Sequence, residues 1–397
     1  MSLADGFNLN APPPDFVQDP FPYYAALTSD APVLAQPDGS FILSAYDDLD
    51  RVYRDTKLFS SDKIRAFAPK FGQSPLYEHH TTSLVFSDPP LHTRVRRIMV
   101  GAMTPRAIGL MEPGLRGAIN TLLDRMENAG SVDLINDYAA AIPIQVIGNL
   151  FDIPMEEREP LRDWSLAILS ALEPVNTKEQ LESGNTAVTE FKSYLKELTD
   201  NRRANPGNPD TDVLTRLIQS TELTETELLQ NCIFILNAGH ETTTNLIGNA
   251  ISVLLEFPEQ LSALKAEPEL INTGVDEFLR YLSPNQFGNR ETTSDCLIGG
   301  VTIPKGTNLH LCIGAANRDP KHFCDPHNLI LSRKPNKHFA FAGGPHTCVG
   351  FTLARMEGRI AVTEFLKRFP NYRLNGEPTL GGRIRFRGYA KLPVVLQ

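Results

Sequence analysis

A single cysteine near the end of the chain has the surroundings of a reactive or metal-binding thiolate. Cys348 follows a glycine-rich loop and directly precedes an apolar, helix-like run that begins at Phe351. The positive end of a helix and its free backbone N–H groups favour a thiolate, the form that binds metal or attacks electrophiles. Gly343, Gly344 and Gly350 would let the backbone approach a large flat ligand closely. The sequence therefore predicts thiolate chemistry at Cys348.

The residues around this cysteine carry a specific family resemblance. The stretch Phe341-Ala-Gly-Gly-Pro-His-Thr-Cys348-Val-Gly350 resembles the haem-binding loop of the cytochrome P-450 superfamily, which are haem-thiolate monooxygenases. The resemblance implies that Cys348 is the axial ligand of the iron of haem b. It also implies that Phe341 packs near the thiolate and that Gly350 contacts the haem. The chain departs from the family pattern at Ala342, where a glycine is usual; both residues are small.

A long apolar helix is predicted in the middle of the chain. Thr224-Glu-Thr-Glu227 is a capping box that opens it, and Pro258 marks its end. A helix over 225–257 spans roughly 50 Å, enough to cross a whole domain. Its centre reads Ala238-Gly-His-Glu-Thr-Thr243. These residues alone fit a helix-packing glycine followed by threonines that bond to the preceding turn.

Next to Cys348, the same segment resembles the family's oxygen-activating motif. The resemblance implies that Ala238 and Gly239 lie beside the haem and leave room for dioxygen. Oxygen activation needs protons delivered into a mostly apolar pocket. The Thr242 hydroxyl could hold an ordered water there, and Glu241 could relay protons between solvent and the interior. Glu241 and Thr242 are therefore the expected catalytic residues.

Four cationic or hydrogen-bonding side chains are candidates for holding the haem propionates, which need such partners when buried. His92 and Arg96 stand at i, i+4 on one face of an expected helix. The resemblance assigns both to the propionates, together with Arg290 and His346. A single His or Arg is more often a solvated surface residue. Four at matching positions favour the haem interpretation.

A buried ionic cluster is also implied by the resemblance. Glu277-Phe-Leu-Arg280 matches the family's ExxR element, and its two charged residues share a helix face. Arg333 would complete a Glu-Arg-Arg cluster. Its expected role is structural: it would lock the segment that precedes the cysteine loop.

The substrate pocket is expected to be mostly apolar, which suits an organic molecule but does not select among terpenoids, fatty acids, aromatics and natural-product intermediates. Lys63, Arg65, His79 and His80 could bind a carboxylate, although the charged residues of a loop usually face water. Beside Ala238, the lining residues that the resemblance implies are Phe67, Phe71, Leu84, Val85, Ile235, Phe287 and Tyr389.

Three other interpretations compete with a monooxygenase. A zinc cluster could use His322, Cys324 and His327 with His346 and Cys348, although these spacings match no standard site. A peroxide-driven haem peroxygenase would need no redox partner and often lacks the acid–alcohol pair. A non-enzymatic haem-thiolate sensor would leave the oxygen-activating residues without a purpose. Dependence of turnover on electron supply separates the haem-based alternatives.

Electrons are expected to come from another protein, because the chain has no strand–GxGxxG–helix unit for a nicotinamide or flavin domain. A ferredoxin or flavodoxin, reduced by an NAD(P)H reductase, is the arrangement that the resemblance implies. A basic patch around the cysteine loop would suit an acidic ferredoxin. The residues expected in it are Arg94, Arg97, Lys334, Lys337, Arg355 and Arg359.

Composition sets broader bounds. The chain has 397 residues with 41% hydrophobic and 21% charged residues, typical of a globular enzyme, and its net charge of −9 argues against nucleic-acid binding. Five scattered cysteines favour a reducing compartment. Residues 1–19 are polar, so we expect neither a signal peptide nor a membrane anchor. We expect a cytoplasmic protein of the bacterial type. We expect one haem domain over 1–397, because motifs from His92 to Cys348 must converge on one cofactor.

The elements that would position these residues are mainly helical. A helix is expected after Asp88-Pro-Pro, and successive helices over 106–270, broken at Pro143, Pro154 and Pro174. Residues 61–90 read as loop. Strands are expected at 40–44, within 285–335 and in the last fifteen residues. The predicted fold class is mainly α with small β-sheets (α+β), and the resemblance implies the cytochrome P-450 fold.

Overall fold

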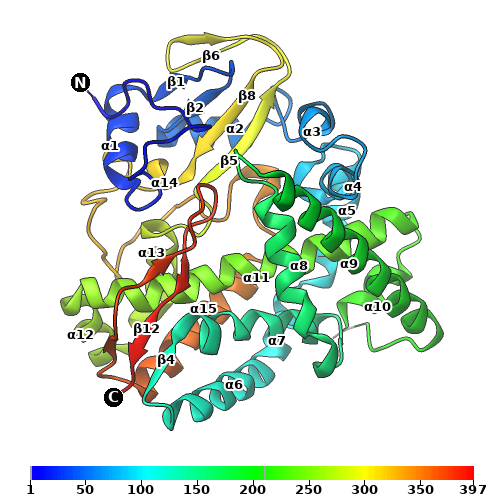
Figure 1. Ribbon diagram of the computed structural model, residues 1–397, viewed down its shortest axis with the longest axis vertical. Helices are drawn as coiled ribbons and strands as arrows, with labels where there is room; N and C mark the ends of the chain where they lie inside the picture. The colour runs from blue at the N-terminus through cyan, green and yellow to red at the C-terminus, as the bar shows by residue number, and fades with distance from the viewer. Residues whose placement is uncertain (1, 210–211) are drawn as a thin grey trace.

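Helices are the main elements of the computed structural model, which describes residues 2–209 and 212–397 (Figure 1). The helices of the first half are α1 (Phe21–Asp30), α2 (Tyr46–Arg54), α3 (Ile64–Phe71), α4 (Pro75–Thr82), α5 (Leu91–Ala102), α6 (Pro105–Glu127), α7 (Ala141–Leu150), α8 (Glu159–Ser170), α9 (Lys178–Ala204) and α10 (Val213–Gln219). The later ones are α11 (Glu225–Glu256), α12 (Pro258–Ala266), α13 (Ile271–Tyr281), α14 (Ile313–Ala316) and α15 (Phe351–Arg368).

The strands form small sheets. They are β1 (Val33–Ala35), β2 (Phe41–Leu43), β3 (Phe59–Ser60), β4 (Ser131–Asp133), β5 (Phe287–Thr292), β6 (Cys296–Ile298), β7 (Val301–Ile303), β8 (Asn308–Cys312), β9 (Arg373–Leu374), β10 (Thr379–Leu380), β11 (Tyr389–Lys391) and β12 (Pro393–Val395). The five-stranded sheet has the order β1-β2-β8-β5-β3, in which only β2 and β8 run parallel. It lies beside α1 at the N-terminal end of the molecule in Figure 1. The mainly α fold with small sheets is confirmed.

The central helix α11 runs across the helical part of the molecule (Figure 1). Its capping box forms as predicted: the Thr224 side chain accepts from the Glu227 N–H, and the Glu227 carboxylate accepts from the Thr224 N–H. Pro258 begins the next helix. The helix contacts α4, α7, α8, α9, α13 and α15.

The hydrophobic core is divided along α11. Residues Leu228 to Leu236 belong to a cluster with α5, α8, α9 and α10. Residues Leu246 to Leu254 belong to a second cluster with α6, α13 and α15. The middle of the helix, 237–245, lies between the two clusters and carries most of the polar residues predicted to act in oxygen chemistry.

Two local predictions are wrong. The region 61–90, expected to be loop, contains α3 and α4. The sequence holds one local signal for α4, because the Ser74 side chain caps it by accepting from the Tyr77 N–H, and Pro75 takes the first position. Pro143 does not break a helix either. It lies in the first turn of α7, where a missing backbone N–H costs little.

Candidate active site

The cysteine loop is held against α2 by close backbone contact. The Cys348 N–H donates to the Phe341 carbonyl at 2.9 Å, which closes the loop just before α15. Gly344 has φ +62°, and a Cβ there would lie 2.1 Å from the Tyr53 carbonyl oxygen. Only glycine fits this position without moving the backbone of α2.

Ala342, the one departure from the family pattern, also has a left-handed backbone, with φ +55°. Its N–H closes a turn by donating to the Phe339 carbonyl at 2.8 Å. An alanine in this conformation costs roughly 1–2 kcal/mol because its Cβ crowds the following carbonyl. The family's usual glycine therefore has a physical reason, and this chain carries local strain in the loop.

The surroundings of the Cys348 thiol include groups that favour its ionised form. Its side chain has free surface, yet burial is the main influence on its pKa, which it raises. The backbone N–H of Gly350 and the guanidiniums of Arg96 and Arg355 act in the opposite direction and favour the thiolate. A Cβ at Gly350 would lie 3.9 Å from the sulfur, an ordinary van der Waals contact, so packing within the protein does not by itself require glycine there.

One stripe of α11, its free face, is less buried than the rest of the helix. Between Leu228 and Leu254, every residue is buried except Phe234, Ala238, Gly239 and Thr242. Phe234, Ala238 and Thr242 are spaced four apart, so they share one face of the helix. The helix also contacts α15, which follows the cysteine loop, so the two predicted motifs lie on neighbouring helices.

Gly239 has a packing role whatever its role toward oxygen. A Cβ at Gly239 would lie 3.2 Å from Ile147 Cδ1 on α7, a tight contact. The Thr242 hydroxyl donates to the Ala238 carbonyl at 2.8 Å, the back-bonding that the sequence left open. Its oxygen lone pairs remain available to accept a hydrogen bond from a water.

Glu241 is buried and paired with an arginine that the sequence analysis did not select. Its Oε2 accepts from Arg383 Nη1 at 2.8 Å. Burial raises the pKa of Glu241 to about 7, although Arg383 lowers it. A carboxyl group that titrates near neutrality can both accept and release a proton. Arg383 lies in Arg383-Ile-Arg-Phe-Arg387, where basic and apolar residues alternate; this pattern was the available signal.

The four propionate candidates converge from three parts of the chain. The rings of His92 on α5 and His346 in the cysteine loop lie 3.9 Å apart. Arg96 Nη2 donates to the Thr347 carbonyl at 2.6 Å. Arg290 on β5 is buried and lies over the Tyr53 ring.

Two of these groups have unused hydrogen-bonding atoms. His92 Nε2 and Arg290 Nε are buried without a hydrogen-bond partner, and Asp88 affects both residues only through its charge. Burial and then the neighbouring Arg96 lower the pKa of His92 to about 4. Burial, Arg290 and His92 lower that of His346 to about 2. Two arginines and two neutral imidazoles in a buried site fit a ligand with two carboxylates, such as the haem propionates.

The Glu277 cluster is fully buried. Glu277 forms a bidentate pair with Arg280 on α13, with both contacts at 2.8 Å. Arg333 Nε donates to the same carboxylate at 3.0 Å. The remaining N–H groups of the two arginines donate to backbone carbonyls of 317–328, ahead of the cysteine loop. The cluster thus ties α13 to that segment.

The predicted pocket residues fall into separate places. Those that share one core cluster are Phe67, Phe71, Leu84 and Ile235. Val85 is exposed. Phe287 packs with Tyr24 in the N-terminal cluster, and the Tyr389 hydroxyl lies 3.0 Å from Ser252 Oγ, near the end of α11. The structure does not bring Val85, Phe287 and Tyr389 into one group with the others.

The geometry does not support the alternative of a zinc site. The His322 ring stacks on Tyr46 at 3.4 Å between centroids. Within residues 2–209 and 212–397, no three His, Cys, Asp or Glu side chains are grouped to hold a metal ion.

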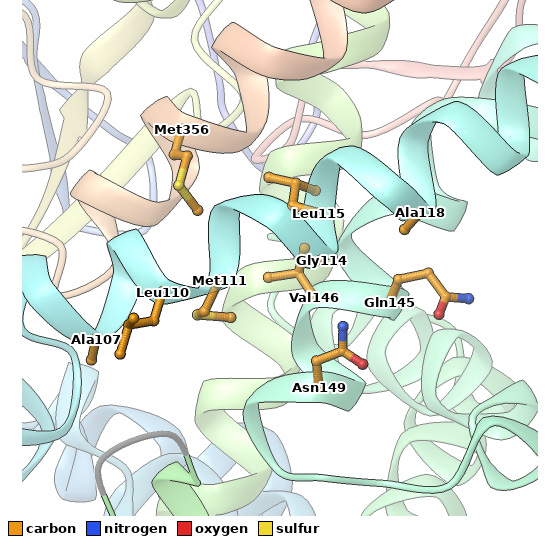
Figure 2. A pocket seen from close by; sticks show the side chains of 10 residues that line it. All are labelled: Ala107, Leu110, Met111, Gly114, Leu115, Ala118, Gln145, Val146, Asn149 and Met356. Carbon is orange, nitrogen blue, oxygen red and sulfur yellow. The ribbon is translucent and has the colours of Figure 1, made fainter.

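A groove of about 220 Å³ lies between α6, α7 and α15, away from the predicted site residues (Figure 2). The groove is lined by Leu110, Met111 and Leu115 of α6, by Gln145 and Asn149 of α7, and by Met356 of α15 (Figure 2). None of the predicted catalytic, haem or substrate residues lines it.

Four of the six basic residues proposed for docking are in ion pairs. Their partners are Glu227 for Arg94, Glu222 for Arg97, Asp276 for Arg355 and Glu112 for Arg359. Lys334 and Lys337 are exposed. Among the helices of the described part of the chain, none has the length and apolar character to cross a membrane.

Comparison with known proteins places this geometry in one family. The family model for cytochrome P450 matches residues 33–372. A biotin biosynthesis cytochrome P450 of Bacillus subtilis (strain 168) is 33% identical over 396 residues, which cover 96% of this chain and 98% of the relative. Vitamin D(3) 25-hydroxylase of Pseudonocardia autotrophica is 34% identical over 393 residues, 96% of this chain and 94% of the relative.

A solved structure shares the whole fold. P450BioI, crystallised in complex with a hexadec-9Z-enoic acid-ligated acyl carrier protein, superposes with a TM-score of 0.92 at 32% identity, covering 96% of this chain and 100% of that one. The matched family model, the full-length relatives and this fold show that the chain belongs to the cytochrome P450 family, which are haem-iron monooxygenases.

Proposed function

We propose that the chain, as a single haem domain over 1–397, inserts one oxygen atom from O2 into a mostly apolar organic substrate, with haem b as cofactor and Cys348 as its axial ligand. The outcome would be hydroxylation, epoxidation or oxidative dealkylation. The observation that carries this is the convergence of His92, Arg96, Arg290 and His346 beside the loop of Cys348, with His92 Nε2 and Arg290 Nε buried without a hydrogen-bond partner. The name of one relative, a hydroxylase, supports the reaction class.

The chain's own residues would bind and orient the cofactor. The haem iron, when bound, supplies the activation of dioxygen. Cys348 provides the thiolate, which the Gly350 N–H and Arg96 stabilise. Arg96 and Arg290 supply positive charge for the propionates, and the neutral rings of His92 and His346 supply N–H donors.

Proton delivery would depend on the middle of α11. The Thr242 hydroxyl lies on the free face of the helix and can hold a water, because its own hydrogen goes to Ala238. Glu241 is buried and titrates near pH 7, so it can exchange protons at neutral pH. Arg383 fixes its position and opposes its protonation.

The first test is the absorption spectrum of the reduced protein under carbon monoxide. A strongly red-shifted Soret band that disappears in Cys348→Ala is expected for the thiolate ligand. A band typical of histidine ligation that survives the substitution would contradict the assignment. The Cys324→Ala variant, which removes an exposed cysteine elsewhere, is the matched control.

Electrons would come from a ferredoxin or flavodoxin reduced by an NAD(P)H reductase, in the cytoplasm. Charge reversal at Arg97 or Lys337 should lower ferredoxin-driven turnover and spare peroxide-driven turnover. Turnover with peroxide that equals or exceeds ferredoxin-driven turnover would favour the peroxygenase alternative. Haem binding without turnover from either source would favour the sensor.

A further inference from the structure

A second group of basic side chains comes from elements other than the cysteine loop, and its members are Lys63, Arg385 and His310. Lys63, directly before α3, is only 1% exposed, and its Nζ has no hydrogen-bond partner. Arg385, in the turn between β10 and β11, has an unpartnered Nε. His310 on β8 is 6% exposed, with an unpartnered Nδ1.

Strand β5 brings these three side chains to one part of the fold. His310 of β8 pairs with Asn289, Arg385 Nη1 donates to the Phe287 carbonyl, and Lys63 follows β3, whose Ser60 pairs with Glu291. Burial lowers the pKa of Lys63 to about 7, and Arg290 and then Arg385 act in the same direction. Arg385 and Lys63 also lower the pKa of His310, which burial brings to about 3. Arg385 is fixed in place, because its Nη1 donates to the Phe287 carbonyl at 3.4 Å and its carbonyl accepts from the Gln286 N–H.

The carboxylates around this group are engaged elsewhere. Glu173 accepts from the backbone N–H groups of Ile384 and Arg385. Glu291 pairs with Arg65 at 2.7 Å. Asp88 accepts from the Ser61 N–H at 2.9 Å. Glu291 and Asp88 are near enough to raise the pKa of Lys63, but none of the three carboxylates hydrogen-bonds its Nζ, which is buried without a partner.

An apolar surface adjoins these cations. Phe67 lies one turn after Lys63, and its backbone N–H donates to the Lys63 carbonyl at 2.8 Å. The Phe67 ring packs with Phe71 and Phe86 at 5.2 and 5.1 Å between centroids. A ligand that met both parts would need an anionic end and an apolar body.

We propose that Lys63 and Arg385, with His310 beside them, bind the carboxylate of an acidic, amphiphilic substrate whose apolar body lies along Phe67. This rests on the proposed function and narrows its substrate class. The haem propionates are a separate pair of anions, for which Arg96, Arg290, His92 and His346 already provide partners.

The test compares matched ligands on the purified haem protein. Dodecanoic acid, its methyl ester and dodecanol are titrated by calorimetry and by the Soret spin-state shift. We expect the acid to bind at least about tenfold more tightly than either neutral ligand. Lys63→Met and Arg385→Gln should each weaken binding of the acid by about 10- to 100-fold and leave binding of dodecanol unchanged. Lys63→Arg should keep the preference.

The control is Lys57→Met, which removes an exposed lysine six residues away and should change neither affinity. Equal affinity of wild type for the acid and its ester would overturn the proposal without any variant. A second result would also overturn it: Lys63→Met loses haem, and Arg385→Gln still binds the acid more tightly than dodecanol. Lys63 would then be a partner of a haem propionate and not of the substrate. Failure of the proposed function is seen separately, as the absence of the thiolate band under carbon monoxide.

Discussion

Arg383 and Glu241 join the C-terminal turn to the centre of α11 through a nearly buried ion pair. The contact is 2.8 Å long, and the two side chains are 15% and 9% exposed. The acid of the expected proton relay is therefore held by a residue 142 positions away in the chain. Its protonation depends on that turn as well as on its own helix.

Loss of this arginine should move the titration of Glu241. Burial raises the pKa of Glu241 to about 7 and Arg383 lowers it, so Arg383→Gln should shift it upward by about one unit. The pH–rate profile of ferredoxin-driven turnover should shift in the same direction. In Glu241→Gln the corresponding limb should disappear. An unchanged profile in Arg383→Gln would separate Glu241 from the proton pathway.

Glu241 should also make the protein less stable as the pH rises. The pKa of Glu241 is raised from 4.5 to about 7 in the folded protein, so as the pH rises the unfolded chain releases this proton at a lower pH than the folded protein does. The free energy of unfolding should then fall between pH 4.5 and about 7, by at most about 3 kcal/mol, and stay lower above that range. Thermal midpoints of the haem protein across this window measure it. Glu241→Gln should flatten the dependence, whereas exposed Glu377→Gln should not.

Local signals accounted for much of the fold and for part of the site. The capping box at Thr224 and the proline at 258 set the ends of α11, because hydrogen bonds within one turn decide them. The i, i+4 spacing of His92 and Arg96 likewise follows from one helix. The short helices α3 and α4 were missed because each has a mixed pattern of polar and apolar residues.

Other features of the site depend on tertiary packing, which a local sequence pattern does not predict. Arg383 and Arg385 reach the site because their turn lies against β5 and the segment at Glu173. Phe287 is aromatic and close to Arg290 in sequence, yet it alternates to the opposite face of β5 and packs on Tyr24. The strain at Ala342 follows from the tight turn to Phe339, which the residue types alone did not show.

Replacing Ala342 with glycine should stabilise the cysteine loop. Its φ of +55° strains an alanine but not a glycine. Greater freedom of glycine in the unfolded chain offsets part of the gain, so the net effect should be about +0.5 to 1 kcal/mol. A rise in the thermal midpoint and slower haem loss would show it. Ala340→Gly, at a position without a positive φ in the same loop, should instead destabilise.

Removing Glu277 should prevent stable folding of the haem-loaded protein. Arg280 and Arg333 would be left as buried cations without a carboxylate, at a cost of about 3–5 kcal/mol. The yield of protein with the thiolate band and the urea midpoint of what remains measure this loss. The comparison is Asp50→Ala, which breaks a pair with Arg54 whose side chains are 72% and 35% exposed.

That exposed pair should contribute no more than about 1 kcal/mol, because water and salt screen it. Both substitutions remove one carboxylate from an arginine on the same helix, but Glu277 is buried and also binds Arg333, so the difference between them measures the whole buried cluster. Glu277→Gln keeps the shape of the side chain and two hydrogen-bonding atoms but loses the charge. It should lie between Glu277→Ala and wild type. Equal losses of stability for Glu277→Gln and Glu277→Ala would mean that charge alone stabilises the cluster. A Glu277→Ala protein as stable as Asp50→Ala would contradict the structural role of the cluster.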